Sequence, residues 1–322
     1  MDKVYLHNIK TYTKTDQGYL FEKFDLTVLK GISEKGQKNR HTFHGAEIRL
    51  MMDSPIKITL NSLDVSEVMI YYGDFQGELF KIEGETTLRL ENPFKKEDLD
   101  KVMPFYRFHP NCLRILFKES LILKSIEGDY HIPTLDDIPK KKYLAYGTSI
   151  TQGRNSFTPD LTYPQLIAFE LGYDVTNLGM SGSCYIDQAL VDDMLKDNYH
   201  LITLELSVNM LGDLFSVDEF KQRLTYLLNR IQERQPNAVV VGLSILNNWR
   251  CYGFDQQRGT YLDLVAFREA FESLMANYPN FIFIDGKTVI DKHHLSKDLI
   301  HPSQYGMIEI ANHILTKLKD VI

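Results

Sequence analysis

Cysteine is scarce in this sequence. Its 322 residues include only Cys112, Cys184 and Cys251, which lie far apart along the chain. Such a set neither builds the disulfide framework of a small secreted domain nor supplies the paired spacing of a zinc knuckle. Residues 1–8 also lack the continuous apolar core of a signal peptide. We therefore expect the protein to work in a reducing cytoplasm.

Long apolar runs and an excess of basic residues are absent as well. No stretch approaches the ~20 apolar residues that cross a bilayer. The 36 Lys and Arg are outnumbered by 43 Asp and Glu, which gives a formal charge of −7. Nucleic acids and anionic membranes are bound by clustered Lys and Arg, so we expect neither as a partner. The sequence leaves the oligomeric state open.

Up to residue 135 the chain consists of short runs with the alternation of antiparallel strands, separated by turn residues. No long helical pattern interrupts them, which favours a β-sandwich or jelly roll in residues 1–135. Two prolines within residues 132–139 then indicate a linker. The expected strands are residues 19–30, 46–52, 56–60, 68–72, 78–82, 86–90 and 113–117.

Residues 136–322 alternate between nearly continuous apolar runs and amphipathic segments. The expected strands are residues 143–146, 173–177, 201–206, 238–245 and 281–284. Helices are expected after the capping residue Thr162 and over residues 217–232, 265–277 and 305–318. Strands buried on both faces and separated by helices predict a three-layer α/β domain with a doubly wound parallel sheet.

Ser149 stands in a small Gly-bounded turn directly after the first of these later strands. Serine is a poor nucleophile at neutral pH, and an imidazole oriented by a carboxylate is the usual means of activating it. Asp298 and His301 near the C-terminus supply both groups. Residues 177–183 and Asn209 follow the next two strands, and the carboxyl ends of parallel strands meet at one edge of the sheet. The sequence therefore predicts a serine hydrolase with its site at that edge.

Four segments resemble, in order and spacing, the four sequence blocks of the SGNH, or GDSL-like, hydrolases. They are residues 147–153, 177–182, 205–209 and 298–301. The first block reads Gly-Thr-Ser in place of Gly-Asp-Ser, and the third lacks the usual Gly and the Asp after Asn. The match covers residues 141–322 and implies the flavodoxin-like sheet of that superfamily. The β-rich half is similar, at the level of pattern, to the accessory sandwich of its two-domain carbohydrate esterases.

The resemblance implies a role for each matching residue. Ser149 is the nucleophile, His301 the general base and then the general acid, and Asp298 the group that orients His301. The implied oxyanion donors are the backbone N–H groups of Ser149 and Gly182 and the side-chain amide of Asn209. No cofactor is implied.

Each residue also has a purely structural interpretation. Ser149 can cap a helix, Asn209 can form an Asx turn, and Asp298 can hold the loop before the last helix. Gly179 is an alternative to Gly182 as the backbone oxyanion donor. Because all four segments occur in the expected order, the sequence favours the catalytic interpretation over these structural ones.

A metal site is a further alternative, because several potential ligands lie close together near the C-terminus. Adjacent histidines cannot easily face one ion, and no His-x-x-x-His helix or cysteine pair supports them. We therefore expect no metal. The residues concerned are Asp291, His293, His294, Asp298 and His301.

Residues 246–259 follow the fourth strand of the parallel sheet and so overhang the predicted site. Their aromatic and amide side chains, Trp249 among them, suit stacking on a sugar ring, although packing against the neighbouring domain is equally consistent. No extended apolar cover indicates a long-chain lipase. We expect hydrolysis of a short acyl ester, an O-acetyl group on a carbohydrate or similar polyol. An acyltransferase with the same machinery and a carbohydrate-binding protein with a vestigial hydrolase domain are the alternatives.

Overall fold

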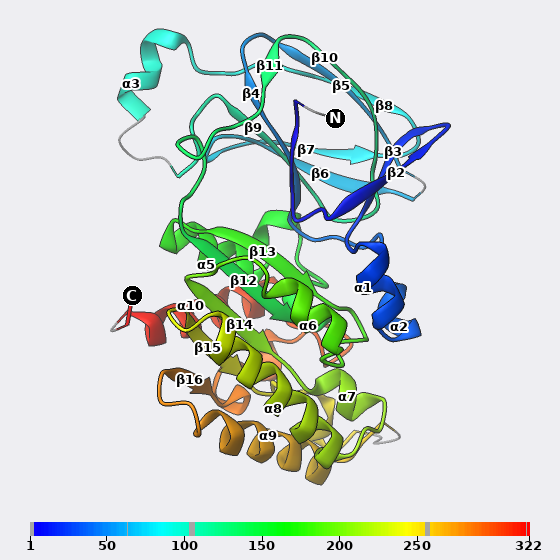
Figure 1. Ribbon diagram of the computed structural model, residues 1–322, viewed down its shortest axis with the longest axis vertical. Coiled ribbons are helices and arrows are strands. Elements are labelled where there is room, and N and C mark those ends of the chain that lie inside the picture. Colours follow the sequence, from blue (N-terminus) through cyan, green and yellow to red (C-terminus); the bar gives the residue numbers. More distant parts are fainter. Residues whose placement is uncertain (1–2, 63, 103–106, 255–257, 320) are drawn as a thin grey trace.

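The computed structural model describes residues 3–62, 64–102, 107–254, 258–319 and 321–322. Figure 1 shows two units, a pair of antiparallel sheets at the top and a parallel sheet covered by helices beneath it. Residues 132–141, which join the units, contain neither helix nor strand, in agreement with the predicted linker. The division into domains at residues 135 and 136 stays a prediction.

Two antiparallel sheets enclose the apolar core of the first unit. One has the order β1–β4–β9–β6–β7, with β11 paired to β4, and the other has the order β2–β3–β10–β5–β8. In β5 the side chains of Ile56, Ile58 and Leu60 are buried while Lys57 is half-buried, as expected of a strand with one face on a core. The strands are β1 (Tyr5–His7), β2 (Thr11–Thr15), β3 (Gly18–Glu22), β4 (Ala46–Met52), β5 (Ile56–Asn61), β6 (Ser66–Tyr72), β7 (Phe75–Ile82), β8 (Thr86–Leu90), β9 (Cys112–Phe117), β10 (Ile122–Glu127) and β11 (Tyr130–His131).

The strand expected over residues 19–30 is wrong in its second half. Strand β3 ends at Glu22, and the chain then forms the helices α1 (Leu26–Gly31) and α2 (Glu34–Gln37). Asp25 caps α1 by accepting the N–H groups of Thr27 and Val28. Buried Val28 and Leu29 place one face of α1 in the core of the second unit. In Figure 1 both helices leave the antiparallel sheets and lie beside the parallel-sheet unit, where α1 contacts α6 (Gln188–Met194).

The second unit is built on five parallel strands in the order β13–β12–β14–β15–β16. Each lies close to a strand expected from the sequence. With the first strand placed between the second and the third, the order is that of flavodoxin-like sheets, with its switch point between β12 and β14. The strands are β12 (Lys142–Gly147), β13 (Asp174–Gly179), β14 (Leu201–Glu205), β15 (Val239–Leu243) and β16 (Phe281–Ile284).

Helices cover both faces of this sheet, so the unit has three layers (Figure 1). Tyr143 and Ala145 of β12 share a core with α5 (Tyr163–Leu171) and α10 (Gln304–Leu318). Leu144 and Tyr146 face the opposite core, with α6, α8 (Val217–Arg234) and α9 (Tyr261–Met275). Successive side chains of a strand point to opposite faces, which explains why all four are apolar or aromatic.

Capping residues set the helix boundaries. Thr162 caps α5 and Gly172 ends it in the left-handed conformation, as expected from the sequence. Helix α9 begins four residues before the expected start, because Thr260 and Asp263 form a capping box. None of the helices among the described residues has the length and apolar character of a membrane span. The shorter elements are α3 (Leu99–Val102), α4 (Ser149–Gln152), α7 (Val208–Gly212), η1 (Lys96–Asp98), η3 (Pro159–Leu161), η4 (Trp249–Tyr252), η5 (Gly286–Thr288) and η6 (Lys292–His294).

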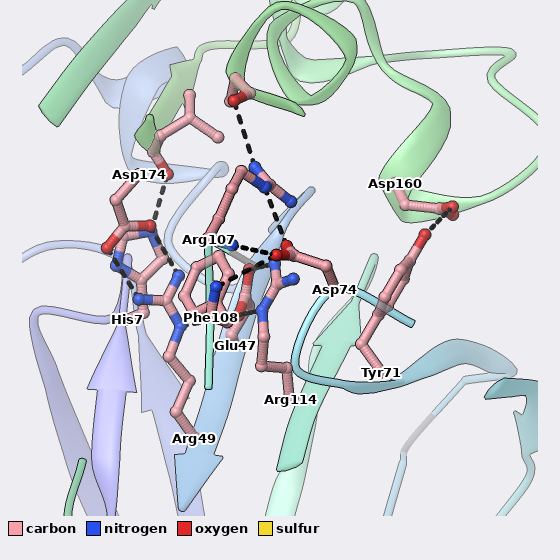
Figure 2. A network of polar contacts seen from close by, with 12 residues as sticks. His7, Glu47, Arg49, Tyr71, Asp74, Arg107, Phe108, Arg114, Asp160 and Asp174 are labelled. Atoms are coloured by element: carbon pink, nitrogen blue, oxygen red, sulfur yellow. Dashed lines mark hydrogen bonds and ion pairs between the residues drawn. The ribbon is translucent and has the colours of Figure 1, made fainter. Parts of the chain in front are cut away.

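A buried network of charged side chains joins the two units (Figure 2). Arg49 on β4 is fully buried and donates to both carboxylate oxygens of Asp174, at the start of β13, over 2.8 and 2.7 Å. It also donates to Glu47 over 2.7 Å. Nearby, Arg107 donates to the Ala168 carbonyl in α5 over 3.1 Å. Buried charges are tolerated when they are paired, and these contacts link β4 and Arg107 of the first unit to β13 and α5 of the second.

Candidate active site

Ser149 is the first residue of α4, a single helical turn that begins where β12 ends. The Thr148 hydroxyl accepts the Ile150 N–H over 3.2 Å and so caps the turn. The Thr148 N–H and hydroxyl in turn donate to the buried Glu205 carboxylate at the end of β14, over 2.9 and 2.6 Å. The turn is therefore tied to the neighbouring strand, and Ser149 lies at the carboxyl edge of the sheet with 6% of its surface exposed.

Ser149, His301 and Asp298 form a chain of hydrogen bonds. The Ser149 Oγ lies 2.7 Å from Nε2 of His301, and Nδ1 of the same ring lies 2.8 Å from Oδ2 of Asp298. A carboxylate only accepts, so Nδ1 carries the ring proton and Nε2 is left to accept the serine hydroxyl. In this arrangement an imidazole can remove a serine proton. The fold thus joins residues that are 152 positions apart in the sequence.

The Asp298 carboxylate is fixed through both oxygens. Its Oδ1 accepts the backbone N–H groups of Ile300 and His301, over 3.0 and 2.9 Å, and the Ser296 hydroxyl over 2.9 Å. Burial raises the pKa of this carboxyl, but the hydrogen bonds from His301 and Ile300 outweigh burial and hold the pKa well below its usual range. Asp298 therefore both holds its loop, through Oδ1, and orients His301, through Oδ2.

The surroundings of the His301 imidazole favour its neutral form. Burial lowers the pKa of His301 below its ordinary value, and the positive charge of Arg154 lowers it further, while Asp298 opposes both. A neutral imidazole is the form that accepts a proton.

Gly182 and Asn209 line the same pocket as Ser149. Asn209 lies in α7, and its Oδ1 accepts the Cys184 N–H over 3.1 Å, which leaves the amide NH₂ as a donor. Neither this NH₂ nor the Gly182 N–H has a hydrogen-bond partner among the described residues. Gly182 has a backbone φ of +68°, a conformation that residues other than glycine rarely adopt. The Asn209 NH₂ and the Gly182 N–H are therefore both free to donate a hydrogen bond in the pocket that contains Ser149.

Gly179, the alternative donor, is used differently. Its N–H donates to the Asn177 side chain over 2.9 Å. A Cβ at this position would lie 2.2 Å from the backbone nitrogen of Gln152 in α4. Gly179 thus allows α4 to pack closely on β13, and this favours Gly182 as the donor.

Ser207 occupies the position of the usual Gly in the third block. It precedes α7 with a φ of 83°, in the left-handed region that glycine favours. The backbone therefore makes the turn without the glycine, and Asn209 follows it into the pocket.

The pocket at Ser149 has a volume of about 400 Å³. The half-buried Trp249, in η4, forms part of its wall. The backbone N–H of Trp249 donates to the backbone carbonyl of Leu299 over 2.7 Å. The loop after β15 is thereby tied to the loop that carries Asp298 and His301. Of the expected substrate loop 246–259, the residues Asp255, Gln256 and Gln257 lie outside the described residues.

The β-rich half also reaches this pocket. Lys35 in α2 lines it, with its ammonium 2.6 Å from Oδ2 of Asp213. The buried Asn39 accepts the Ser181 N–H over 3.1 Å and donates to the Ser181 carbonyl over 3.2 Å and to the Ser183 hydroxyl over 2.9 Å. The segment that bears Gly182 is therefore held by the first unit.

Four of the five potential metal ligands near the C-terminus form two separate pairs. Asp291 lies 3.2 Å from the His294 ring, whereas Asp298 bonds His301. In the described parts of the chain, no group of three or more His, Cys, Asp or Glu side chains is placed to hold a metal ion.

The family relationship that the four sequence blocks indicate is also found by a family profile. Residues 140–319 match the profile of the GDSL-like Lipase/Acylhydrolase family. The chain belongs to this family. No curated protein shows significant sequence similarity to it.

Solved structures resemble both units of this GDSL-like protein together. A salicylyl-acyltransferase, SsfX3, from a tetracycline biosynthetic pathway is 14% identical, with a TM-score of 0.78 over 99% of this chain and 95% of its own. A family two carbohydrate esterase from Clostridium thermocellum, solved as an active site mutant, is 12% identical, with a TM-score of 0.66 over 100% and 99%. The acetyl xylan esterase Est2A from Butyrivibrio proteoclasticus is 12% identical, with a TM-score of 0.59 over 99% and 95%. At these identities the likeness concerns the fold.

The predicted site residues of this GDSL-like protein lie together in the structure. Five of them line the pocket, and Asp298 lies behind His301. Sequence reasoning missed the polar residues around them, although Arg250 and Arg258 belong to the loop already singled out for its aromatic and amide groups. Lys35 and Asn39 carry no local sequence signal, because their place depends on how α2 packs. The missed residues are Lys35, Asn39, Arg154, Asp213, Arg250 and Arg258.

Proposed function

We propose that this protein is a serine esterase that hydrolyses short acyl esters, namely O-acetyl groups on a carbohydrate or similar polyol. The observation that carries the proposal is the hydrogen-bond chain from Ser149 through His301 to Asp298. The Gly182 N–H and the Asn209 NH₂, which have no partner among the described residues, line the same pocket. Membership of the GDSL-like family supports ester chemistry.

In the first half of the proposed reaction, Ser149 Oγ attacks the ester carbonyl carbon and its proton passes to Nε2 of His301. The carbonyl oxygen becomes an oxyanion that accepts from the N–H groups of Ser149 and Gly182 and from Nδ2 of Asn209. Loss of one such donor typically costs ~3 kcal/mol of transition-state stabilisation. The intermediate then collapses, the alcohol leaves with the proton from His301, and the acyl group stays on Ser149.

In the second half, water attacks the acyl-enzyme while His301 takes its proton. The second tetrahedral intermediate uses the same donors, and its collapse returns the proton to Ser149 and releases the carboxylic acid. Asp298 stays ionised and stabilises the imidazolium that forms in each half. Its lowered pKa supports this role.

The size and lining of the pocket support a small, polar substrate. About 400 Å³ lies at the lower end of ligand sites, and one aromatic ring, Trp249, stands among polar and charged groups. A ring of this kind suits stacking on a sugar face. Structural neighbours named as carbohydrate and acetyl xylan esterases agree with this substrate class.

An acyltransferase is the second candidate, because the neighbour with a TM-score of 0.78 is named as one. The same acyl-enzyme would then be attacked by an alcohol in place of water. A carbohydrate-binding protein with a vestigial hydrolase domain is the third candidate, and the complete Ser149–His301–Asp298 chain argues against it.

A series of p-nitrophenyl esters from acetate to octanoate tests the proposal. We expect the highest kcat/KM for acetate and a loss of about 10⁴-fold or more in Ser149→Ala. A preference for octanoate would contradict the short-acyl assignment. Added sugars or alcohols that receive more of the acyl group than water does would identify an acyltransferase.

A further inference from the structure

The charge of the pocket wall is opposite to the charge of the chain. The whole chain has a formal charge of −7. The described residues that line the pocket nevertheless include four cations, Lys35, Arg154, Arg250 and Arg258, against one carboxylate, Asp213. A site lined by one sign of charge concentrates ligands of the other sign.

Asp213 does not neutralise this wall. Lys35 Nζ lies 2.6 Å from its Oδ2, and Arg258 Nη2 lies 3.0 Å from its Oδ1. The Tyr185 hydroxyl donates to it as well. One carboxylate is thus paired with two cations, and it forms no ion pair with the remaining two, Arg154 and Arg250.

Arg250 is a buried cation that forms no ion pair with a carboxylate among the described residues, and Asp263 acts on it only through space. Arg250 is 2% exposed, and its guanidinium donates only to neutral acceptors, the carbonyls of Arg258 and Gly259, over 3.2 Å each, and the Asn248 side chain over 3.5 Å. Burial and the charge of Arg258 lower the pKa of Arg250 to about 10 although Asp263 opposes them, so Arg250 stays protonated at neutral pH. A buried charge without its opposite is costly, and a ligand that brings the opposite charge relieves that cost.

Arg250 and Arg154 lie near the reacting groups. The Arg250 guanidinium lies 4.1 Å from the centre of the Trp249 ring, so the aromatic wall and the cation form one surface. Arg154 follows α4 directly, is exposed, and makes no ion pair with a described residue. Arg154 lines the pocket together with His301, and its positive charge lowers the pKa of that imidazole.

We propose that the natural substrate is an anionic ester, whose carboxylate or similar anion binds Arg250 and Arg154 while its ester carbonyl lies at Ser149. This inference rests on the proposed function and narrows its substrate class. Guanidinium groups bind carboxylates through paired, charge-assisted hydrogen bonds, which a neutral amide does not reproduce. The anion belongs either to the alcohol, as in an acetylated uronic acid, or to the acyl group, as in a half-ester of a dicarboxylic acid.

Matched esters that differ only in charge test the proposal. One arm compares an O-acetylated methyl glucuronoside with the O-acetylated methyl glucoside, and the other compares monomethyl succinate with methyl succinamate. We expect kcat/KM to favour the anionic ester by about tenfold or more in one arm, and that arm locates the anion. About 0.5 M NaCl should reduce the preference, because salt screens exposed charges.

Variants assign the preference to named cations. In Arg250→Gln, and separately in Arg154→Gln, we expect the ratio of anionic to neutral kcat/KM to fall about tenfold. Arg154 is exposed, so its variant answers the question even where the buried Arg250→Gln folds poorly. Arg89→Gln, at an exposed site on β8, removes the same charge outside the pocket and should leave the ratio unchanged.

Binding gives a readout that does not depend on turnover. Trp249 is the only tryptophan in the chain, so its fluorescence reports on the pocket. Succinate or glucuronate should give a saturable change that succinamide or glucose does not give, and Arg250→Gln should weaken it about tenfold.

Equal turnover of anionic and neutral esters in both arms, without selective anion binding, would overturn the inference and leave the esterase proposal standing. Selective, Arg250-dependent anion binding without turnover of any ester would support the anion site and overturn the esterase proposal.

Discussion

Asn39, in the β-rich half, exchanges two hydrogen bonds with the backbone of Ser181, next to Gly182. The N–H of Gly182 is one of the donors proposed to meet the oxyanion. The first unit therefore contacts the segment that bears this proposed donor.

Asn39→Ala should lower kcat by about tenfold with a smaller change in KM, because a displaced oxyanion donor weakens the transition state more than the bound ester. Steady-state kinetics on p-nitrophenyl acetate measures both constants. Asn61→Ala, on β5 in the same half, is the matched control and should change neither. An unchanged kcat in folded Asn39→Ala would contradict this positioning role.

Asn209→Asp separates the two functions of that side chain. The carboxylate can still accept the Cys184 N–H, but it donates nothing and places a negative charge where the oxyanion forms. We expect kcat to fall by about 10²–10³-fold, with thermal unfolding close to that of the wild type. A mild effect on kcat would show that Asn209 is not an oxyanion donor.

Asp298→Asn should reduce kcat/KM by about 10⁴-fold while the protein stays folded. The asparagine oxygen can still accept the Ile300 and His301 N–H groups, but its NH₂ then faces Nδ1 of His301 and forces the wrong tautomer. Circular dichroism checks the fold. Loss of structure with little loss of specific activity would indicate that Asp298 only holds the loop.

The pH dependence follows from the lowered pKa of His301. Only the neutral imidazole accepts the serine proton, so kcat/KM should be full above this pKa and fall as the pH decreases through it. The midpoint should lie below the ordinary pKa of an imidazole, about 6.5. In Arg154→Gln the midpoint should rise, because a neighbouring cation that disfavours the imidazolium is gone. A midpoint that falls in this variant would contradict the assignment.

The sequence predicts the parallel sheet, and it places Ser149, Asp298 and His301 at one edge of that sheet, for a physical reason. Strands β12, β14 and β15 are buried along almost their whole length and read as mainly apolar runs, and Ser149 and Asn209 come after two of them. The exposed strand β2, with the sequence Thr-Tyr-Thr-Lys-Thr, carries no comparable pattern and was not expected. The strand predicted over residues 19–30 includes helix α1, whose buried Val28 and Leu29 lie between polar residues and show no helical period.

The charged pocket wall could not be predicted from the sequence either. Asp213, Lys35 and Arg258 come from α2 and from two loops, and only the packing of the units brings them together. No local periodicity marks residues of this kind. Asn39 is a further example, since its partners lie 142 and 144 positions away.

Covalent labelling with a fluorophosphonate tests the central claim most directly, because the reagent reacts with an activated serine whatever the natural ester. Mass spectrometry of the digested wild-type protein should find the adduct on the peptide that contains Ser149, and Ser149→Ala should remain unlabelled. His301→Ala should slow the reaction by about 10³-fold or more, since the hydroxyl then lacks its base. Folded wild-type protein that stays unlabelled, or an adduct on another serine, would contradict the account.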